Sequence, residues 1–253
     1  MTTARRKGSA AALARSVWIY HGDAERSRAM DALYARFLKA GDLAFDIGAH
    51  VGDRVSSFRR LGARVVALEP QPGPARVIRF LHGRDPAVTL VQAAAGEREG
   101  EVALYVNTAN PTVSTASAAF VRAAEGAEGW EGQAWDETIA VPCLTLDSLV
   151  RVHGRPDFVK IDVEGFEDRV LRGLSEPVPA LSFEFTTIAR DVAQRCIGRL
   201  AALGPYGFDV ALGETQRLAF GRWMRASDMA AHLAALPHAA NSGDVYAVLM
   251  SPE

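Results

Sequence analysis

The sequence predicts an α/β protein in which a mostly parallel sheet of seven strands is covered by helices on both faces. Short apolar runs alternate with amphipathic helical runs, and that alternation is typical of strands buried on both faces of a parallel sheet. The clearest strand-to-helix unit is PDFVKIDVEGFEDRVLRGL, in which a buried strand precedes apolar residues at helical spacing. The length of 253 residues suffices for one such domain and is short for two.

The first half of the chain is predicted to hold three strands of this sheet, after a helical N-terminal extension. Residues 1–40 are expected to form the extension, in which an amphipathic helix continues to Phe37. Tyr20 and His21 are expected at the surface, with a position over the mouth of the cofactor site as the alternative. The main domain would span 41–253. We expect strands at 43–47, 64–68 and 88–94, and helices at 52–61 and 73–82.

A long segment without a periodic pattern divides the second half. Residues 107–138 are rich in Ser, Thr, Ala, Gly and Glu, and we expect a lid or an acceptor-binding insertion there, with disorder as the alternative. The strands on either side, 101–106 and 139–141, are expected to pair as a side hairpin. The remaining predicted strands end near Asp162 or cover 180–185, 208–212 and 245–250; the remaining helices cover 144–152, 166–174, 189–203 and 228–236, the last with Ser227 as its N-cap.

Charge and composition exclude several classes of protein. The 28 basic and 30 acidic residues give a net charge of −2, which argues against nucleic acid as a partner. The longest uncharged segment, 102–121, contains asparagines, a proline and hydroxyls, so no membrane span is expected. Cys143 and Cys196 lack the spacing of a disulfide framework or a zinc cluster. Arg15 interrupts the apolar run that a secretory leader needs, and we expect a cytoplasmic protein.

The stretch FDIGAHVGD predicts a ligand-binding turn. The strand ends at Asp46, and Gly48 and Gly52 allow a tight turn and a close approach to a ligand, although a purely structural turn suits this pattern equally well. A dinucleotide site would need GxGxxG, and His50 stands where the third glycine might be expected. Glu69 ends the next strand, about 20 residues further on, which is the spacing at which an acidic side chain binds ribose hydroxyls.

Charged residues also end a later strand, in the stretch KIDVEG. Lys160, Asp162 and Glu164 alternate along it, so they begin on one face at the carboxyl end, where α/β sites lie. Charges in an apolar strand are costly to bury unless they pair or act, and a Lys160 ion pair with helix-start carboxylates is the structural alternative. Asp162 or Glu164 could be a general base or could hold a divalent cation. Glu184 ends the strand ALSFEF at the same edge, where a structural role suits it equally well.

Five blocks of the sequence together resemble one family. They are DIGAHVGDR, ALEPQP, VQAAAGEREGEVALYV, LTLDSL and FVKIDVEGFEDRVLRGL. In this order and at this spacing, residues 41–174 are similar to the FkbM-type S-adenosylmethionine-dependent methyltransferases. The resemblance implies a Rossmann-like class I methyltransferase fold with an antiparallel last strand. It also implies transfer of a methyl group, usually to a hydroxyl oxygen.

The resemblance further implies which residues bind the cofactor. Glu69 would bind the ribose, His50 stands where the family often has asparagine, and Gln92 would lie beside the adenine. The cofactor is a sulfonium cation with a zwitterionic amino acid, so it suits carboxylates and backbone N–H groups and needs no phosphate cradle. Carried over by motif, the cofactor-binding residues are Asp46, Gly48, His50, Gly52, Glu69, Gln92 and Ala93.

The sequence therefore predicts a methyltransferase that uses S-adenosylmethionine and acts on an oxygen of a sugar, glycan or small secondary metabolite. Catalytic residues are expected among Lys160, Asp162, Glu164 and Glu184, and a divalent metal is left open. The expected partner is a small-molecule or glycan acceptor, without nucleic acid or membrane, and a homo-oligomer is left open. The alternatives are an NAD(P)-dependent oxidoreductase, against which the missing GxGxxG argues, and a non-catalytic ligand-binding protein of the same fold.

Overall fold

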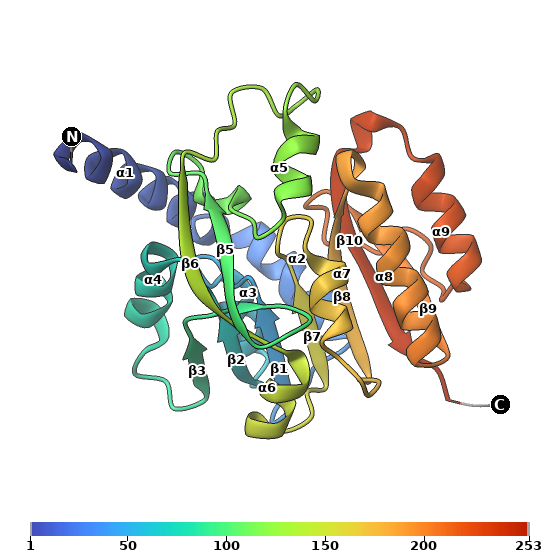
Figure 1. Ribbon diagram of the computed structural model, residues 1–253. Coiled ribbons are helices and arrows are strands. Elements are labelled where there is room, and N and C mark those ends of the chain that lie inside the picture. Colours follow the sequence, from blue (N-terminus) through green and yellow to red (C-terminus); the bar gives the residue numbers. More distant parts are fainter. Residues whose placement is uncertain (1, 252–253) are drawn as a thin grey trace.

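The structure is a computed structural model that describes residues 2–251, and its centre is a seven-stranded sheet (Figure 1). The strand order is β3-β2-β1-β7-β8-β10-β9. Neighbouring strands from β3 to β8 pair in parallel, and β10 runs antiparallel to β8 and β9. The mostly parallel sheet with an antiparallel last strand is therefore confirmed. The strands are β1 Leu43–Ile47, β2 Arg64–Leu68, β3 Val88–Val91, β7 Phe158–Ile161, β8 Ala180–Thr186, β9 Tyr206–Leu212 and β10 Ser242–Leu249.

A smaller sheet has the strand order β4-β6-β5, with β4 Ala94–Ala95, β5 Gly100–Val106 and β6 Glu137–Leu144 (Figure 1). The predicted strand 88–94 is thus divided between two sheets. The N–H of Ala93 donates to the carbonyl of Val91 at 3.1 Å, and this turn leads the chain out of β3. The predicted side hairpin is confirmed and is longer than expected, because β5 pairs with β6 along its whole length.

Helices cover both faces of the main sheet. Val55, Phe58 and Ile78 of α3 and α4 pack on one face together with α2, and α6 to α9 pack on the other. Successive residues of β1 alternate between the two faces. Within the described residues, no helix combines the length and the apolar character that crossing a membrane requires. The helices are α1 Thr2–His21, α2 Ala24–Tyr34, α3 Asp53–Arg60, α4 Pro72–His82, α5 Ala118–Ala124, α6 Leu146–His153, α7 Glu167–Arg172, α8 Arg190–Leu203 and α9 Ala226–Ala235, with 3-10 turns at Pro111–Val113, Thr187–Ala189 and His238–Ala240.

Among the helix boundaries that differ from the prediction, two concern the residue that caps the helix. The first helix does not continue to Phe37, because Asp23 caps a new helix after Gly22. The Asp23 carboxylate accepts hydrogen bonds from the backbone N–H groups of Glu25 and Arg26, at 2.8 and 3.0 Å. At the other end of the chain α9 begins at Ala226, so Ser227 lies inside the helix and does not cap it.

An aromatic cluster attaches the N-terminal residues to the middle of the sheet. Phe158 of β7 is fully buried, and its ring centroid lies 5.6 Å from Tyr34, 5.2 Å from Phe37 and 6.0 Å from Phe58. Aromatic pairs at such distances each contribute about 0.5–1.5 kcal/mol beyond the area that they bury. Residues before β1 therefore belong to the hydrophobic core that packs against one face of the central strands.

The change Phe158→Ala should lower the free energy of unfolding by about 3–5 kcal/mol, because it leaves a cavity among three aromatic rings. Urea denaturation followed by circular dichroism would measure the loss. Phe80→Ala is the matched control, since the Phe80 side chain is 86% exposed, and its cost should stay within about 0.5 kcal/mol. Equal losses in the two variants would contradict the proposed role of this cluster.

Candidate active site

A pocket lies at the edge of the main sheet where the carboxyl ends of the parallel strands meet. The loops after β1, β2 and β7 form most of it, and the turn between β3 and β4 and residues 112–116 complete it. Open α/β sheets bind their ligands at this edge. The pocket is lined by Gly48, His50, Leu68, Glu69, Pro70, Gln71, Ala93, Ala94, Ala95, Leu104, Thr112, Ser114, Thr115, Ala116, Asp162, Val163 and Phe166.

Only glycine fits where the loop after β1 approaches the loop after β7. A Cβ on Gly48 would lie 1.8 Å from the backbone oxygen of Asp162, and the φ of Gly48, +85°, is in the left-handed region. The N–H of Asp162 donates in turn to the carbonyl of Ile47 at 2.9 Å. The two stretches FDIGAHVGD and KIDVEG are therefore in direct backbone contact at the pocket.

The Glu69 carboxylate fastens two loops of the pocket together. One oxygen accepts a hydrogen bond from the N–H of His50 at 2.9 Å, and the other accepts from the N–H of Gln71 at 2.7 Å. Burial raises the pKa of Glu69 to about 8, although both backbone donors favour the ionised form. Each carboxylate oxygen has a second lone pair, so Glu69 can still accept hydrogen bonds from a ligand.

His50 lies at the contact between the pocket and the N-terminal helix. Its ring meets the Tyr20 ring edge-on at 5.4 Å, and burial lowers the pKa of His50 to about 4, so the ring is neutral near pH 7. Nε2 of His21 lies 2.9 Å from the backbone oxygen of Val51 in the same loop. Tyr20 and His21, expected at the surface, are thus partly buried against the loop after β1.

The first part of segment 107–138 forms a wall of the pocket. The Gln71 side chain donates to the carbonyl of Pro111 at 3.0 Å and accepts from the Ser114 hydroxyl at 3.1 Å. The Thr115 hydroxyl donates to the backbone oxygen of Glu164 at 2.7 Å. These bonds connect the wall to the loops after β2 and β7.

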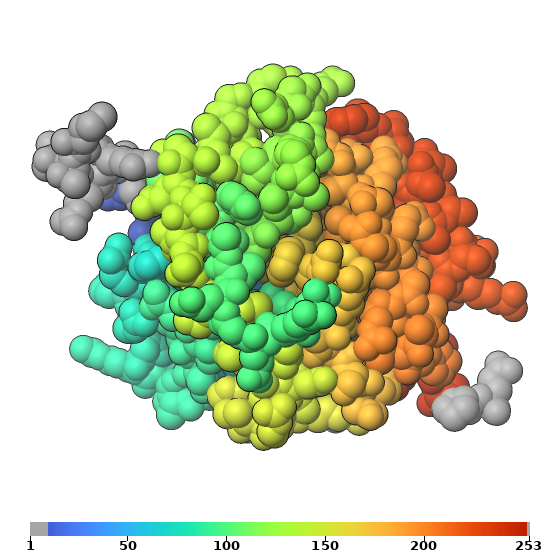
Figure 2. Space-filling view, viewed as in Figure 1, coloured from blue at the N-terminus to red at the C-terminus, as the bar shows by residue number. Residues whose placement is uncertain are grey.

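The rest of the segment is packed around aromatic rings. Phe120 of α5 meets Trp130 and Trp135 edge-on, with centroids 5.1 and 6.2 Å apart, and Trp135 donates its indole N–H to the carbonyl of Val113 at 2.8 Å. A Cβ on Gly165 would lie 2.5 Å from the Phe120 ring. Figure 2 shows the segment as a light-green ridge at the top of the molecule.

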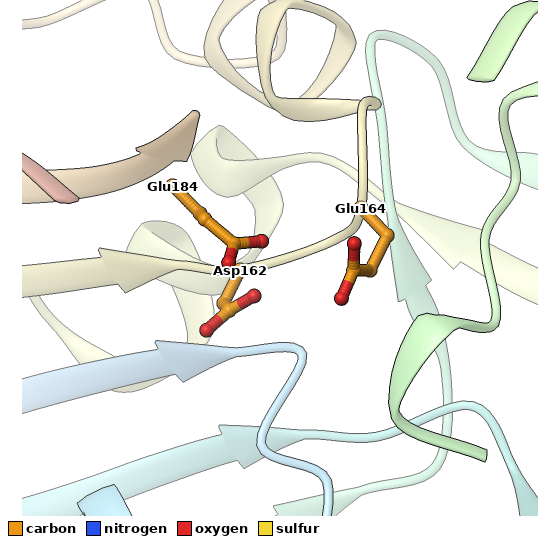
Figure 3. Close-up of side chains that lie close together, drawn as sticks. All are labelled: Asp162, Glu164 and Glu184. Carbon is orange, nitrogen blue, oxygen red and sulfur yellow. The ribbon is translucent and has the colours of Figure 1, made fainter. Parts of the chain in front are cut away.

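Three carboxylates gather beside the pocket. Asp162 follows β7, Glu164 lies in the loop after it and Glu184 comes from β8, and their side chains face one another (Figure 3). One oxygen of each lies within 4.8 Å of the others. Glu164 has a φ of +55°, which is uncommon outside glycine. Asp162 belongs to this cluster and also lines the pocket, so the two sites are adjacent.

A buried ammonium group supports the carboxylate cluster. Nζ of Lys160, whose side chain is 1% exposed, lies 3.2 Å from Asp162 and 2.5 Å from Asp244 of β10. Burial would lower the pKa of Lys160, but these two carboxylates raise it well above its usual value. Lys160 is therefore a cation that joins β7 to β10 and neutralises part of the charge of its neighbours.

The pKa values of the three carboxyl groups are shifted in different directions, because only Asp162 contacts Lys160. Burial opposes ionisation of Asp162, but Lys160 and the nearby Arg54 outweigh it and lower the pKa of Asp162. Burial and the charge of Asp162 raise the pKa of Glu164 and Glu184 well above the usual range. Carboxylates whose pKa values are separated in this way are typical of acid–base and ion-binding sites.

The other residues predicted to bind the cofactor lie at different depths. Asp46 is buried behind the pocket, burial raises its pKa to about 7, and its Oδ2 has no hydrogen-bond partner among the described residues. Gly52 immediately precedes α3 and does not line the pocket. Ala93 lines the pocket, whereas Gln92 is exposed and lies outside it, because neighbouring side chains of an extended chain point to opposite sides.

Sequence reasoning missed several residues that line the pocket. Gln71 stands in the quoted block ALEPQP, but nothing local shows that its amide binds a segment some 40 residues later. The hydroxyl-rich run 110–117 belongs to the segment that we expect to be a lid or an acceptor-binding insertion, and several of its members line the pocket beside Glu69. The lining residues that were not predicted include Gln71, Thr112, Ser114, Thr115 and Phe166.

The lining of the pocket suits a cationic nucleoside better than a dinucleotide. Ala93, Ala94 and Ala95 offer a small apolar surface, and Glu69 offers a carboxylate close by. None of the described residues that line the pocket is Lys or Arg, the side chains that usually bind phosphate. The residues present therefore fit S-adenosylmethionine, which has an adenosine part and a positive sulfur but no phosphate.

Among the solved structures with a similar course of the chain are two that are described as O-methyltransferases, one of them as putative. An O-methyltransferase from Bacillus cereus in complex with SAH is 13% identical, with 95% of this chain and 91% of that chain covered and a TM-score of 0.48. A putative O-methyltransferase from Klebsiella pneumoniae is also 13% identical, with coverages of 95% and 90% and a TM-score of 0.45. At these scores the likeness carries no argument about the site. No curated protein matches the chain.

A family model gives the decisive match. The model described as the methyltransferase FkbM domain matches residues 46–194, which is more than half of the chain and includes both the pocket loops and the carboxylate cluster. This match favours the methyltransferase over the nicotinamide-dependent oxidoreductase. The chain belongs to the FkbM family of S-adenosylmethionine-dependent methyltransferases.

Proposed function

We propose that this methyltransferase acts on a hydroxyl oxygen of a sugar, a glycan or another small metabolite. The observation that carries the proposal is the double position of Asp162, which lines the pocket and belongs to the carboxylate cluster. Methyl donor and acceptor must meet within bonding distance, so the reaction centre would lie at this shared residue. The net charge of −2 and the absence of Lys and Arg from the described pocket lining favour a small acceptor over nucleic acid.

The pocket would hold the methyl donor in one orientation. When bound, S-adenosylmethionine supplies a methyl group on a positively charged sulfur. Glu69 would accept hydrogen bonds from the ribose hydroxyls, and Ala93 would lie against the adenine. The backbone at Gly48 and the neutral ring of His50 would face the methionine end, and the buried carboxylate of Asp46 would add negative charge behind it.

The carboxylate cluster would activate the acceptor. Transfer to oxygen forms a carbon–oxygen bond, breaks a carbon–sulfur bond and releases one proton from the hydroxyl. The cluster of Asp162, Glu164 and Glu184 would lie beside the acceptor hydroxyl and promote the loss of that proton, and the Lys160 ion pair would keep Asp162 in place. Segment 107–138 would close the site against water, because its wall is already joined to the loops after β2 and β7.

Glu69→Gln should weaken the binding of S-adenosylmethionine about 10- to 100-fold, because the amide N–H₂ would face one of the two backbone donors that Glu69 accepts from, and such a mismatch costs about 1–3 kcal/mol. Isothermal titration calorimetry would measure the dissociation constant. Glu97→Gln is the matched control, because this carboxylate pairs with Arg169 and Arg172 outside the pocket and should leave the affinity unchanged. Wild-type affinity in Glu69→Gln would exclude the ribose role.

Turnover with a panel of sugars, glycans and hydroxylated metabolites tests the proposed function. Mass spectrometry and NMR should detect an O-methyl product together with S-adenosylhomocysteine. Glu164→Gln and Glu184→Gln should each lower kcat at least about 100-fold while the affinity for S-adenosylmethionine stays near that of the wild type. Methylation of carbon or nitrogen alone, or full activity in both variants, would contradict the proposal.

A further inference from the structure

We propose that Asp162, Glu164 and Glu184 form a binding site for one divalent cation, Mg²⁺ or Mn²⁺. The existence of the site is inferred from the three side chains themselves, whereas its role in activating an acceptor hydroxyl rests on the proposed function. Asp162 and Glu164 follow β7, and Glu184 belongs to the neighbouring strand β8, so the sheet brings them together (Figure 3).

The spacing of the carboxylates suits a cation with oxygen ligands. One oxygen from each residue lies within 4.8 Å of the other two. Around an octahedral ion with bonds of about 2.1 Å, ligand oxygens are about 3 Å apart when adjacent and about 4 Å apart when opposite. Small rotations of the side chains would therefore bring all three oxygens onto one ion.

The environment of Glu164 is an independent indication of a ligand. This side chain is 93% buried, since it is 7% exposed, and its carboxylate has neither a hydrogen bond nor an ion pair within the part of the chain that the structure describes. It points toward Asp162 and Glu184 (Figure 3). On Glu184, Oε2 is also buried without a hydrogen-bond partner among the described residues. Buried polar groups are normally satisfied, so Oε2 of Glu184 and the unpartnered carboxylate of Glu164 indicate room for a ligand between them.

Lys160 does not serve as that partner. Its ammonium group lies 3.2 Å from Asp162 and 2.5 Å from Asp244, and it forms no ion pair with Glu164 or Glu184 in the described structure. Lys160 instead holds Asp162 through Oδ2. This contact resembles the way in which outer groups orient a metal ligand and tune its basicity.

The ligand set indicates the kind of ion. Three carboxylates without cysteine or histidine favour hard cations such as Mg²⁺ or Mn²⁺ over Zn²⁺. Three protein ligands also leave positions for water and for an acceptor oxygen. An ion beside Asp162 would adjoin the pocket and lower the pKa of an acceptor hydroxyl, whose proton would leave to solvent water.

Direct metal binding by the full-length protein tests the proposal. The protein is first dialysed against EDTA, and the chelator is then removed. A titration with Mn²⁺ should show one saturable site, as monitored by calorimetry and by the electron paramagnetic resonance signal of free Mn²⁺. Glu164→Gln and Glu184→Gln, made separately, should each raise the dissociation constant at least about tenfold. Asp191→Asn is the matched control, because this exposed carboxylate pairs with Arg195 on α8 and should leave binding unchanged.

The outcomes separate this proposal from the proposed function. Thermal melts would first establish that each variant is folded. Absence of a saturable Mn²⁺ site in the wild-type protein, or equal binding in wild type and both variants, would overturn the cation site. O-methylation that persists undiminished in EDTA would overturn its catalytic role and leave the proposed function intact. Mn²⁺ binding that depends on Glu164 and Glu184 supports the site even where no hydroxyl acceptor is methylated, a result that would count against the proposed function alone.

Discussion

The buried ammonium of Lys160 is the interaction on which the arrangement of the site depends. A lysine in the middle strand of a sheet is tolerated only because Asp162 and Asp244 accept its charge. The same contacts fix the direction of Asp162, and thereby the place where the pocket meets the cluster. Breaking a buried pair by removing one partner commonly costs about 3–5 kcal/mol. Lys160 therefore contributes both to the geometry of the site and to the stability of this region.

Backbone contacts and side-chain hydrogen bonds position the loops around Lys160 and its partners. The close approach of Gly48 to Asp162 sets the distance between the ends of β1 and β7 at the pocket. Glu69 and Gln71 then join the neighbouring loops to the wall formed by segment 107–138. Because the wall also forms a hydrogen bond to the backbone of Glu164, a movement of the segment would also shift the carboxylate cluster. The pocket and the carboxylate cluster are thus connected through this segment.

Much of the fold could be predicted from the sequence, because strands buried on both faces leave continuous apolar runs and the glycine-rich turn leaves a fixed spacing. The carboxylates of KIDVEG and ALSFEF could be identified because charges in such runs are rare. Partners distant in sequence could not be found. Asp244 lies 84 residues from Lys160, and Gln71 binds Pro111 and Ser114 through a side-chain amide. The strand β4 has two residues, too few for any periodic pattern.

The contacts of the N-terminal helices limit where the chain can be cut without disturbing the core. Sequence similarity to the family begins at residue 46, yet Tyr20 packs on His50 and Tyr34 packs on Phe158 from the preceding helices. The folded domain therefore includes helices that precede the part of the chain matched by the family model. A chimera or fragment cut at the family boundary would expose the aromatic core around Phe158 and would remove the packing of Tyr20 on His50.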